Sequence, residues 1–170
     1  DTTICFNDSM GLFSYLPKGI HYSWSPNLGM LSDTIPIIKI SPTNNITYTV
    51  TVTDNNGCVN TNSVVISVYN LPIVNAGIDT SICYGNRIRL YASGGVKYRW
   101  YPQSGLDRFD SSSVLSFPMI TTTYIVTATD INGCSNSDDV IVFVDSLPVA
   151  NAGNDITLCP GDTTMLLASG

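Results

Sequence analysis

Several residue types are scarce in this chain, and each scarcity removes a class of structure or function. The 170 residues contain no glutamate, so all 13 acidic residues are aspartate. Glutamate favours helices whereas aspartate favours turns, and this bias points away from an α-helical fold. Lysine and arginine number only 7, which leaves a net charge of −6. Such a chain lacks the basic patch that nucleic-acid phosphates require, so no nucleic-acid partner is expected.

Long apolar runs and soft metal ligands are scarce as well. No apolar stretch reaches the roughly 18 residues of a membrane-spanning helix, so no membrane insertion is expected in this segment. The five cysteines include no Cys-x-x-Cys pair, and His21 is the only histidine, which argues against a zinc site. Disulfides in an oxidising, extracellular setting explain these cysteines better. Hydrophobic residues still make up 44% of the chain, enough for a packed core.

The sequence repeats itself with a period of about 76 residues. The sequence YSWSPNLG of residues 22–29 returns as YRWYPQSG at 98–105. The sequence LPIVNAGID of residues 71–79 returns as LPVANAGND at 147–155. Repeats of this length indicate a tandem array of small structural units.

The repeat boundaries predict the domain organisation. We expect a first repeat over residues 1–70 with a truncated first strand, a second over 71–146, and the incomplete start of a third over 147–170. The third unit lacks most of the strands that a sandwich needs. The natural protein is therefore expected to continue beyond both ends of this sequence.

Within each repeat, apolar and polar residues alternate. Tyr48, Val50 and Val52 alternate with threonines, and residues 124–128 repeat the pattern. This period of two is typical of a half-buried β-strand, and the Asn-Gly pair that follows at 56–57 favours a hairpin turn. No segment has a convincing helical period. The chain is therefore predicted to be all-β, with tandem immunoglobulin-like (PKD-like) β-sandwich domains in a head-to-tail array.

Four aromatic residues are predicted to lie in the cores of these sandwiches. Trp24 and Trp100 fall on the third strand of each repeat, where sandwich domains bury a tryptophan. Tyr48 and Tyr124 fall at the start of the penultimate strand, the place of a tyrosine corner.

The linked elements Cys-x-Gly, Tyr-x-Trp and Asp-x-Asn-Gly-Cys resemble the PKD-like and Ig-like repeats of giant Bacteroidota surface proteins. Cys83–Gly85, Tyr98–Trp100 and Asp130–Cys134 carry them here. Those proteins include SprB-like gliding-motility adhesins and other cargo of the type IX secretion system. The resemblance covers the whole chain. It implies export, a place at the cell surface and a role as stalk or adhesive filament.

The resemblance also implies glycosylation. Proteins of this origin carry O-glycans at Asp-Ser/Thr followed by an aliphatic residue, Met or Thr, and the chain contains this triplet five times. An Asp-Ser/Thr pair is good turn chemistry as well, so a purely structural explanation stays open. The candidate O-glycosylation sites are Thr2, Ser9, Thr34, Ser146 and Thr163.

No grouping of residues with catalytic chemistry stands out, and the chain is predicted not to be an enzyme. His21 has no counterpart in the second repeat, where Lys97 takes its place. No cofactor is expected, although calcium is a possible ligand for aspartates at the hairpin tips and after the linkers. Calcium takes six to eight oxygen ligands and only three or four can be named here, so turn formation is favoured. The calcium candidates are Asp54, Asp79, Asp130 and Asp155.

We expect a structural repeat region, a stalk or filament, of a secreted or cell-surface adhesin. Its partners would be neighbouring repeats of the same protein, with surface glycans or other cells as further possibilities. The alternative is a carbohydrate- or protein-binding accessory module of an extracellular enzyme. A carbohydrate site should repeat its loop aromatics in both units, but Phe109 corresponds to Asp33 in the first repeat, which weakens the alternative.

Two disulfide patterns are compatible with the repeats. Pairing within repeats would join Cys5 to Cys58 and Cys83 to Cys134. In an immunoglobulin-like sandwich, however, the first turn and the last hairpin lie at opposite ends, roughly 30 Å apart over nine strand residues. A disulfide needs Cα atoms within about 7 Å.

The other pattern is a cross-repeat bond between Cys5 and Cys134. It would clamp successive domains and send Cys58 to a preceding repeat. Cys83 and Cys159 would then pair with following repeats. We favour this pattern over pairing within repeats.

Overall fold

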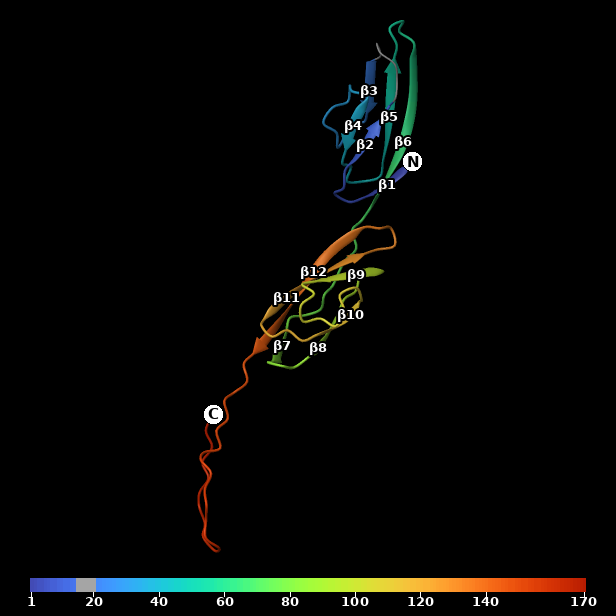
Figure 1. The fold of residues 1–170 in the computed structure, drawn as a ribbon. Coiled ribbons are helices and arrows are strands. Elements are labelled where there is room, and N and C mark those ends of the chain that lie inside the picture. Colours follow the sequence, from blue (N-terminus) through green and yellow to red (C-terminus); the bar gives the residue numbers. More distant parts are fainter. Residues whose placement is uncertain (15–20) are drawn as a thin grey trace.

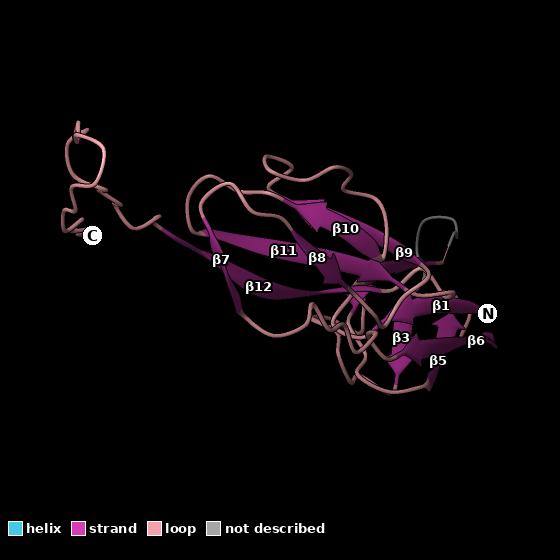
Figure 2. Cartoon of the chain, turned by 90° about the horizontal axis from the view of Figure 1, so that it is seen from below, coloured by secondary structure: helices cyan, strands magenta, loops and turns pink. Residues whose placement is uncertain are grey.

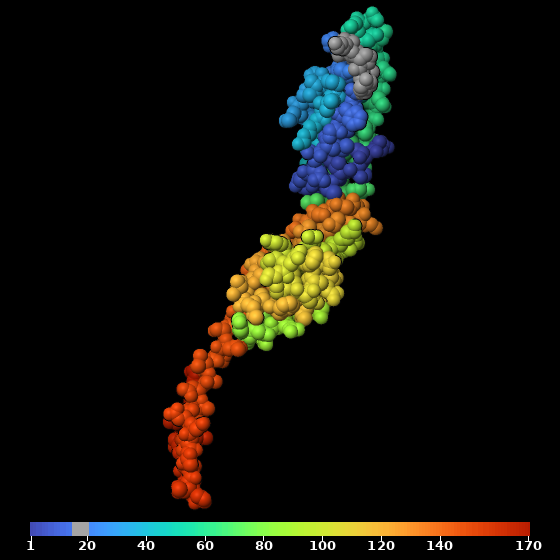
Figure 3. Space-filling view, viewed as in Figure 1, coloured from blue at the N-terminus to red at the C-terminus, as the bar shows by residue number. Residues whose placement is uncertain are grey.

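The computed structural model describes residues 1–14 and 21–170 of the chain. Over these residues it contains twelve β-strands and no helix, hence none that could span a membrane. Two β-sandwiches follow one another along an elongated molecule, and residues 146–170 extend from the far end of the second (Figures 1 and 3). The predicted all-β, head-to-tail architecture is therefore the observed one.

The first sandwich is built from the first six strands. A four-stranded sheet in the order β1-β6-β5-β3 faces the two-stranded sheet β2-β4. Strand β1 runs parallel to β6, and the other neighbours are antiparallel. The bounds are β1 Thr2–Cys5, β2 Met10–Phe13, β3 His21–Ser25, β4 Ile37–Ile40, β5 Ile46–Thr53 and β6 Val59–Tyr69.

The second sandwich repeats this topology strand for strand. Its sheets are β7-β12-β11-β9 and β10-β8, and β7 is again parallel to the last strand (Figure 2). The repeat in the sequence is therefore a repeat of the fold. The bounds are β7 Thr80–Cys83, β8 Ile88–Tyr91, β9 Lys97–Tyr101, β10 Ser113–Ser116, β11 Thr122–Thr129 and β12 Ser135–Asp145.

Each sandwich has its own hydrophobic core, in which the four predicted aromatics are buried. The indole Nε1 of Trp24 donates to the carbonyl of Ile35, and that of Trp100 donates to the carbonyl of Ser111. These bonds satisfy the one polar group that each tryptophan takes into the core.

The two buried tyrosines are anchored in the same way. The hydroxyl of Tyr48 donates to the carbonyl of Leu28, and that of Tyr124 donates to the carbonyl of Ser104 at 2.9 Å. Each bond closes the loop that leaves the third strand onto the penultimate strand. Burial raises the pKa of both phenols above the ordinary value of 10.0, since it disfavours the charged phenolate. For Tyr124 the Ser116 side chain opposes this shift in pKa in part.

The linker segment, residues 71–78, connects the sandwiches and packs onto the second one. Pro72 and Ala76 are buried, and Asn75 forms a backbone bridge with Ser93. The segment is thus an ordered part of the second sandwich. Residues 146–170 are exposed and contain no strand, although Asn151 and Ser169 form the equivalent bridge.

Candidate functional site at the junction between the repeats

A disulfide between Cys5 and Cys134 connects the two sandwiches. The cysteines are 129 residues apart in sequence, and their Cα atoms lie 5.6 Å apart. Cys5 ends β1 at the lower end of the first sandwich, and Cys134 lies at the β11–β12 hairpin, which meets that end (Figure 1). This is the cross-repeat bond favoured from the sequence.

Hydrogen bonds to their backbone groups hold both cysteines in place. Cys5 pairs with Tyr69 in the parallel ladder of β1 and β6, and the amide of Phe6 donates to the carbonyl of Tyr69. In the hairpin, Oδ1 of Asp130 accepts the amide of Cys134 at 2.9 Å, and the carbonyl of Cys134 accepts the amide of Asp130 at 2.9 Å. The shape of the tip is therefore fixed by hydrogen bonds to its own aspartate as well as by the disulfide.

The register of β6 explains why the within-repeat alternative does not occur. Cys5 lies opposite Tyr69, the last residue of β6, whereas Cys58 precedes Val59, the first residue of that strand. Eleven residues of extended chain separate the two ends, roughly 35 Å at ~3.3 Å per residue. Cys58, Cys83 and Cys159 are free and exposed.

The junction thus has two covalent connections, the linker segment and the disulfide. Side chains near the hairpin secure the linker: Nδ2 of Asn136 donates to the carbonyl of Pro72 at 3.1 Å. A carboxylate oxygen of Asp138 accepts the amide of Ala76 at 2.8 Å. Two connections at separate points resist bending and rotation more than one flexible linker would.

The aspartates considered for calcium are engaged in the backbone. Oδ1 of Asp54 accepts the amides of Asn56 and Cys58, and Asp130 makes the equivalent bonds in its own hairpin. Asp79 accepts the amide of Ile141 on β12 rather than reaching a hairpin tip. Asp155 lies in the exposed C-terminal stretch. Among residues 1–14 and 21–170, no three His, Cys, Asp or Glu side chains gather in a metal-binding arrangement.

The glycosylation candidates differ in accessibility. Thr2 is half-buried within β1. The remaining four are exposed and lie outside the strands: Ser9, Thr34, Ser146 and Thr163.

Two loop features of the second sandwich bear on a carbohydrate or catalytic role. Phe109 packs against the core with the Arg99 guanidinium 5.4 Å from its ring centroid, so it does not stand free to stack on a sugar. Asp107 accepts the amide of Leu115, and this hydrogen bond lowers the pKa of the Asp107 carboxyl. The positive charges of Arg108 and Arg89 lower this pKa further, and desolvation opposes the shift in part. The shift keeps Asp107 ionised, the opposite of what a general acid needs.

No protein-family model and no curated protein matches the sequence. Several solved structures have a similar fold. DIP-gamma IG1+IG2 is 14% identical with a TM-score of 0.37, over 85% of this chain and 93% of that one. The C-terminal 282-residue fragment of intimin, solved with the Tir intimin-binding domain, is 15% identical with a TM-score of 0.47, over 88% and 62%.

Three N-terminal domains of the bacteriophage RB49 outer capsid protein Hoc are 16% identical with a TM-score of 0.42, over 90% and 59%. These identities and TM-scores are too low to transfer a function from any of these proteins.

The residues that hold the linker segment on the second sandwich were not predicted from the sequence. The repeated Asn-Ala-Gly at 75–77 and 151–153 was the available signal, because a motif that recurs in a linker suggests a structural partner. That partner, around Asp138, is 62 residues away from Ala76 in sequence and could not be identified from local pattern.

Proposed function

We propose that the chain is a structural repeat region, a stalk or filament, of a secreted or cell-surface adhesin, in which a disulfide locks each repeat to the next. The observation that carries the proposal is the Cys5–Cys134 bond between sandwiches. A disulfide that joins successive domains, rather than the two sheets of one domain, contributes to the stiffness of an array. Stiffness along one axis is what a stalk requires.

Composition and motifs support the cell-surface part of the proposal. A disulfide persists in oxidising compartments, which fits an exported protein. The motifs that resemble Bacteroidota surface repeats favour export by the type IX route and a role in gliding adhesion, and the five Asp-Ser/Thr triplets favour O-glycosylation. The partners would be neighbouring repeats and, at the tip of the stalk, glycans or proteins of other surfaces.

Residual dipolar couplings of the oxidised chain test the stalk role. If the junction is rigid, one alignment tensor fits the amides of both sandwiches. The Cys5→Ser variant should need two tensors, because only the linker then joins the units. Cys58→Ser is the matched control, since Cys58 is exposed and unbonded. Two independent tensors in the oxidised wild-type chain would refute a stiff stalk.

A further inference from the structure

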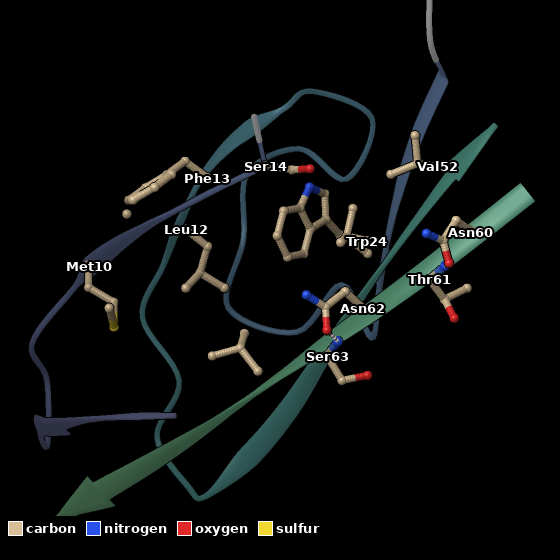
Figure 4. A pocket seen from close by; sticks show the side chains of 13 residues that line it. Met10, Leu12, Phe13, Ser14, Trp24, Val52, Asn60, Thr61, Asn62 and Ser63 are labelled. Atoms are coloured by element: carbon tan, nitrogen blue, oxygen red, sulfur yellow. Dashed lines mark hydrogen bonds between the residues drawn. The ribbon is translucent and has the colours of Figure 1, made fainter. Parts of the chain in front are cut away.

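A groove opens on the first sandwich between β2 and β6 (Figure 4). It has a volume of about 570 Å³, and its floor includes Leu12, Trp24 and Val50. Asn60 and Asn62 of β6 line its edge. An apolar hollow edged by amides is suited to an extended peptide, which offers small apolar side chains and backbone hydrogen-bonding groups.

In the second sandwich the linker segment covers the equivalent place. Ala76 is part of that core, only 1% exposed, and Val74 packs against it. The residues beneath the linker segment are correspondingly less exposed to solvent: Val126 is 0% exposed, whereas its counterpart Val50 in the first sandwich is 8% exposed. Val140 on β12 is buried, but its counterpart Val64 on β6 is only half-buried.

The polar contacts of the linker segment also have counterparts at the groove. Asn136, which donates to the carbonyl of Pro72, corresponds to Asn60. Asp138, which accepts the amide of Ala76, corresponds to Asn62. Oδ1 of Asn62 already accepts the amide of Ser63 at 2.9 Å, and its second lone pair can accept a further amide. Both asparagines are exposed and edge the groove.

We propose that this groove is a binding site for a peptide of the type Leu-Pro-x-x-Asn-Ala-Gly, the linker of a neighbouring repeat, held by Asn60 and Asn62 as Asn136 and Asp138 hold residues 71–78. The chain contains a second such peptide, residues 147–154, and it is exposed. The amide of Gly153 donates to Oδ1 of Asn151 at 2.8 Å, as that of Gly77 donates to Oδ1 of Asn75 at 2.7 Å. The peptide therefore keeps the local shape of the seated linker even where no sandwich covers it.

The location of the groove agrees with the cysteine arrangement. Asn60 lies two residues after Cys58, and Asn136 lies two residues after Cys134. A linker peptide in the groove would therefore enter at the end of the first sandwich that carries the free Cys58. The inference rests on the proposed stalk function, because both require head-to-tail repeats. It adds a non-covalent contact to the covalent connections between successive repeats.

The test extends the full chain at its N-terminus with the eight residues of sequence 147–154, placed directly before Asp1. In sequence, residues 71–78 stand in the same position directly before Asp79. We expect the extension to fill the groove and raise the hydrogen-exchange protection of amides in β5 and β6 by about tenfold. Protection in β11 and β12 should not change, because the second groove is already filled.

Two controls make the result specific. An extension with glutamate in place of its second alanine, which is copied from Ala152 and corresponds to buried Ala76, should give no gain, because a charged side chain cannot enter the core. In the extended chain, the double variant Asn60→Leu with Asn62→Leu should lose most of the gain, whereas Asn44→Ala, at an exposed loop position, should keep it.

No gain in protection, or an equal gain with the glutamate extension, would overturn the proposal. Either result would leave the dipolar-coupling test of the disulfide junction unaffected, because that test depends on the Cys5–Cys134 bond and not on the groove.

Discussion

Oδ1 of Asp130 accepts the backbone amide of Cys134 at 2.9 Å, so the residue that shapes the hairpin tip also positions the cysteine that reaches the first sandwich. Asp54 makes the same bond to Cys58 at 2.8 Å in the first sandwich, where the cysteine is free. The chain thus contains the same turn twice, once with and once without a disulfide.

This pair of turns gives a matched experiment. Asp130→Ala should cost the second sandwich about 1–2 kcal/mol, because it leaves turn amides without their acceptor. It should also make the Cys5–Cys134 bond easier to reduce. Asp54→Ala should destabilise the first sandwich similarly and leave that bond unaffected. Equilibration with dithiothreitol, followed by thiol trapping, measures the effect, and equal reducibility in the two variants would contradict it.

Much of the fold follows from the sequence for identifiable reasons. The alternation around Tyr48 and Tyr124 predicts β5 and β11, and the Asn-Gly pairs predict their hairpins. Strands β4 and β10 were not predicted. Ile37–Ile40 is apolar at three of four positions and shows no alternation. Ser113–Ser116 is short and flanked by serines, so its sequence is typical of a loop.

The candidate site was predictable only in part. The topology of a sandwich favours the cross-repeat disulfide over pairing within repeats, because the two ends of a strand lie too far apart for a disulfide. The packing of the linker segment onto the second sandwich depends on contacts between residues far apart in sequence, such as Ala76 and Asp138. No local sequence pattern predicts such a pairing.

The free cysteines give a second prediction. Cys83 occupies in the second repeat the place of Cys5, and Cys58 occupies in the first the place of Cys134. In a Cys159→Ser variant, oxidised glutathione should link Cys83 of one molecule to Cys58 of another. The glutathione disulfide takes the two electrons, and two molecules of reduced glutathione leave.

A ladder of covalent oligomers on a non-reducing gel is the expected result. Adding either Cys58→Ser or Cys83→Ser should limit the products to dimers, because only one free thiol then remains. Longer ladders in those variants would show that the bonds are not directed head to tail.

The buried tyrosines predict a loss of stability at alkaline pH. Burial raises their pKa in the folded state above 10.0, so the folded chain holds its phenolic protons more tightly than the unfolded chain. The resulting stability is fully present below pH 10 and declines as the pH rises through the folded-state pKa. Urea unfolding between pH 8 and 11 should show this decline, and Tyr48→Phe with Tyr124→Phe should flatten it. An unchanged slope in that variant would rule out these residues as the cause.

Accessibility refines the glycosylation hypothesis. In protein purified from its native organism, we expect sugar at the exposed sites Ser9, Thr34, Ser146 and Thr163 before Thr2, which lies half-buried in β1. Intact-mass analysis should show sugar mass, and Asp→Ala at the preceding residue should remove it site by site. An unmodified mass would exclude O-glycosylation at these triplets.

Peptide mapping under non-reducing conditions tests the central claim most directly. Cleavage before aspartate places each of the five cysteines on a separate peptide, since Asp8, Asp54, Asp79, Asp130 and Asp155 divide the chain between them. The oxidised chain should yield the peptide 1–7 linked to 130–137, with the peptides of the three free cysteines unlinked. A link between 1–7 and 54–78, which would be Cys5 bonded to Cys58, would contradict the cross-repeat junction and the stalk built on it.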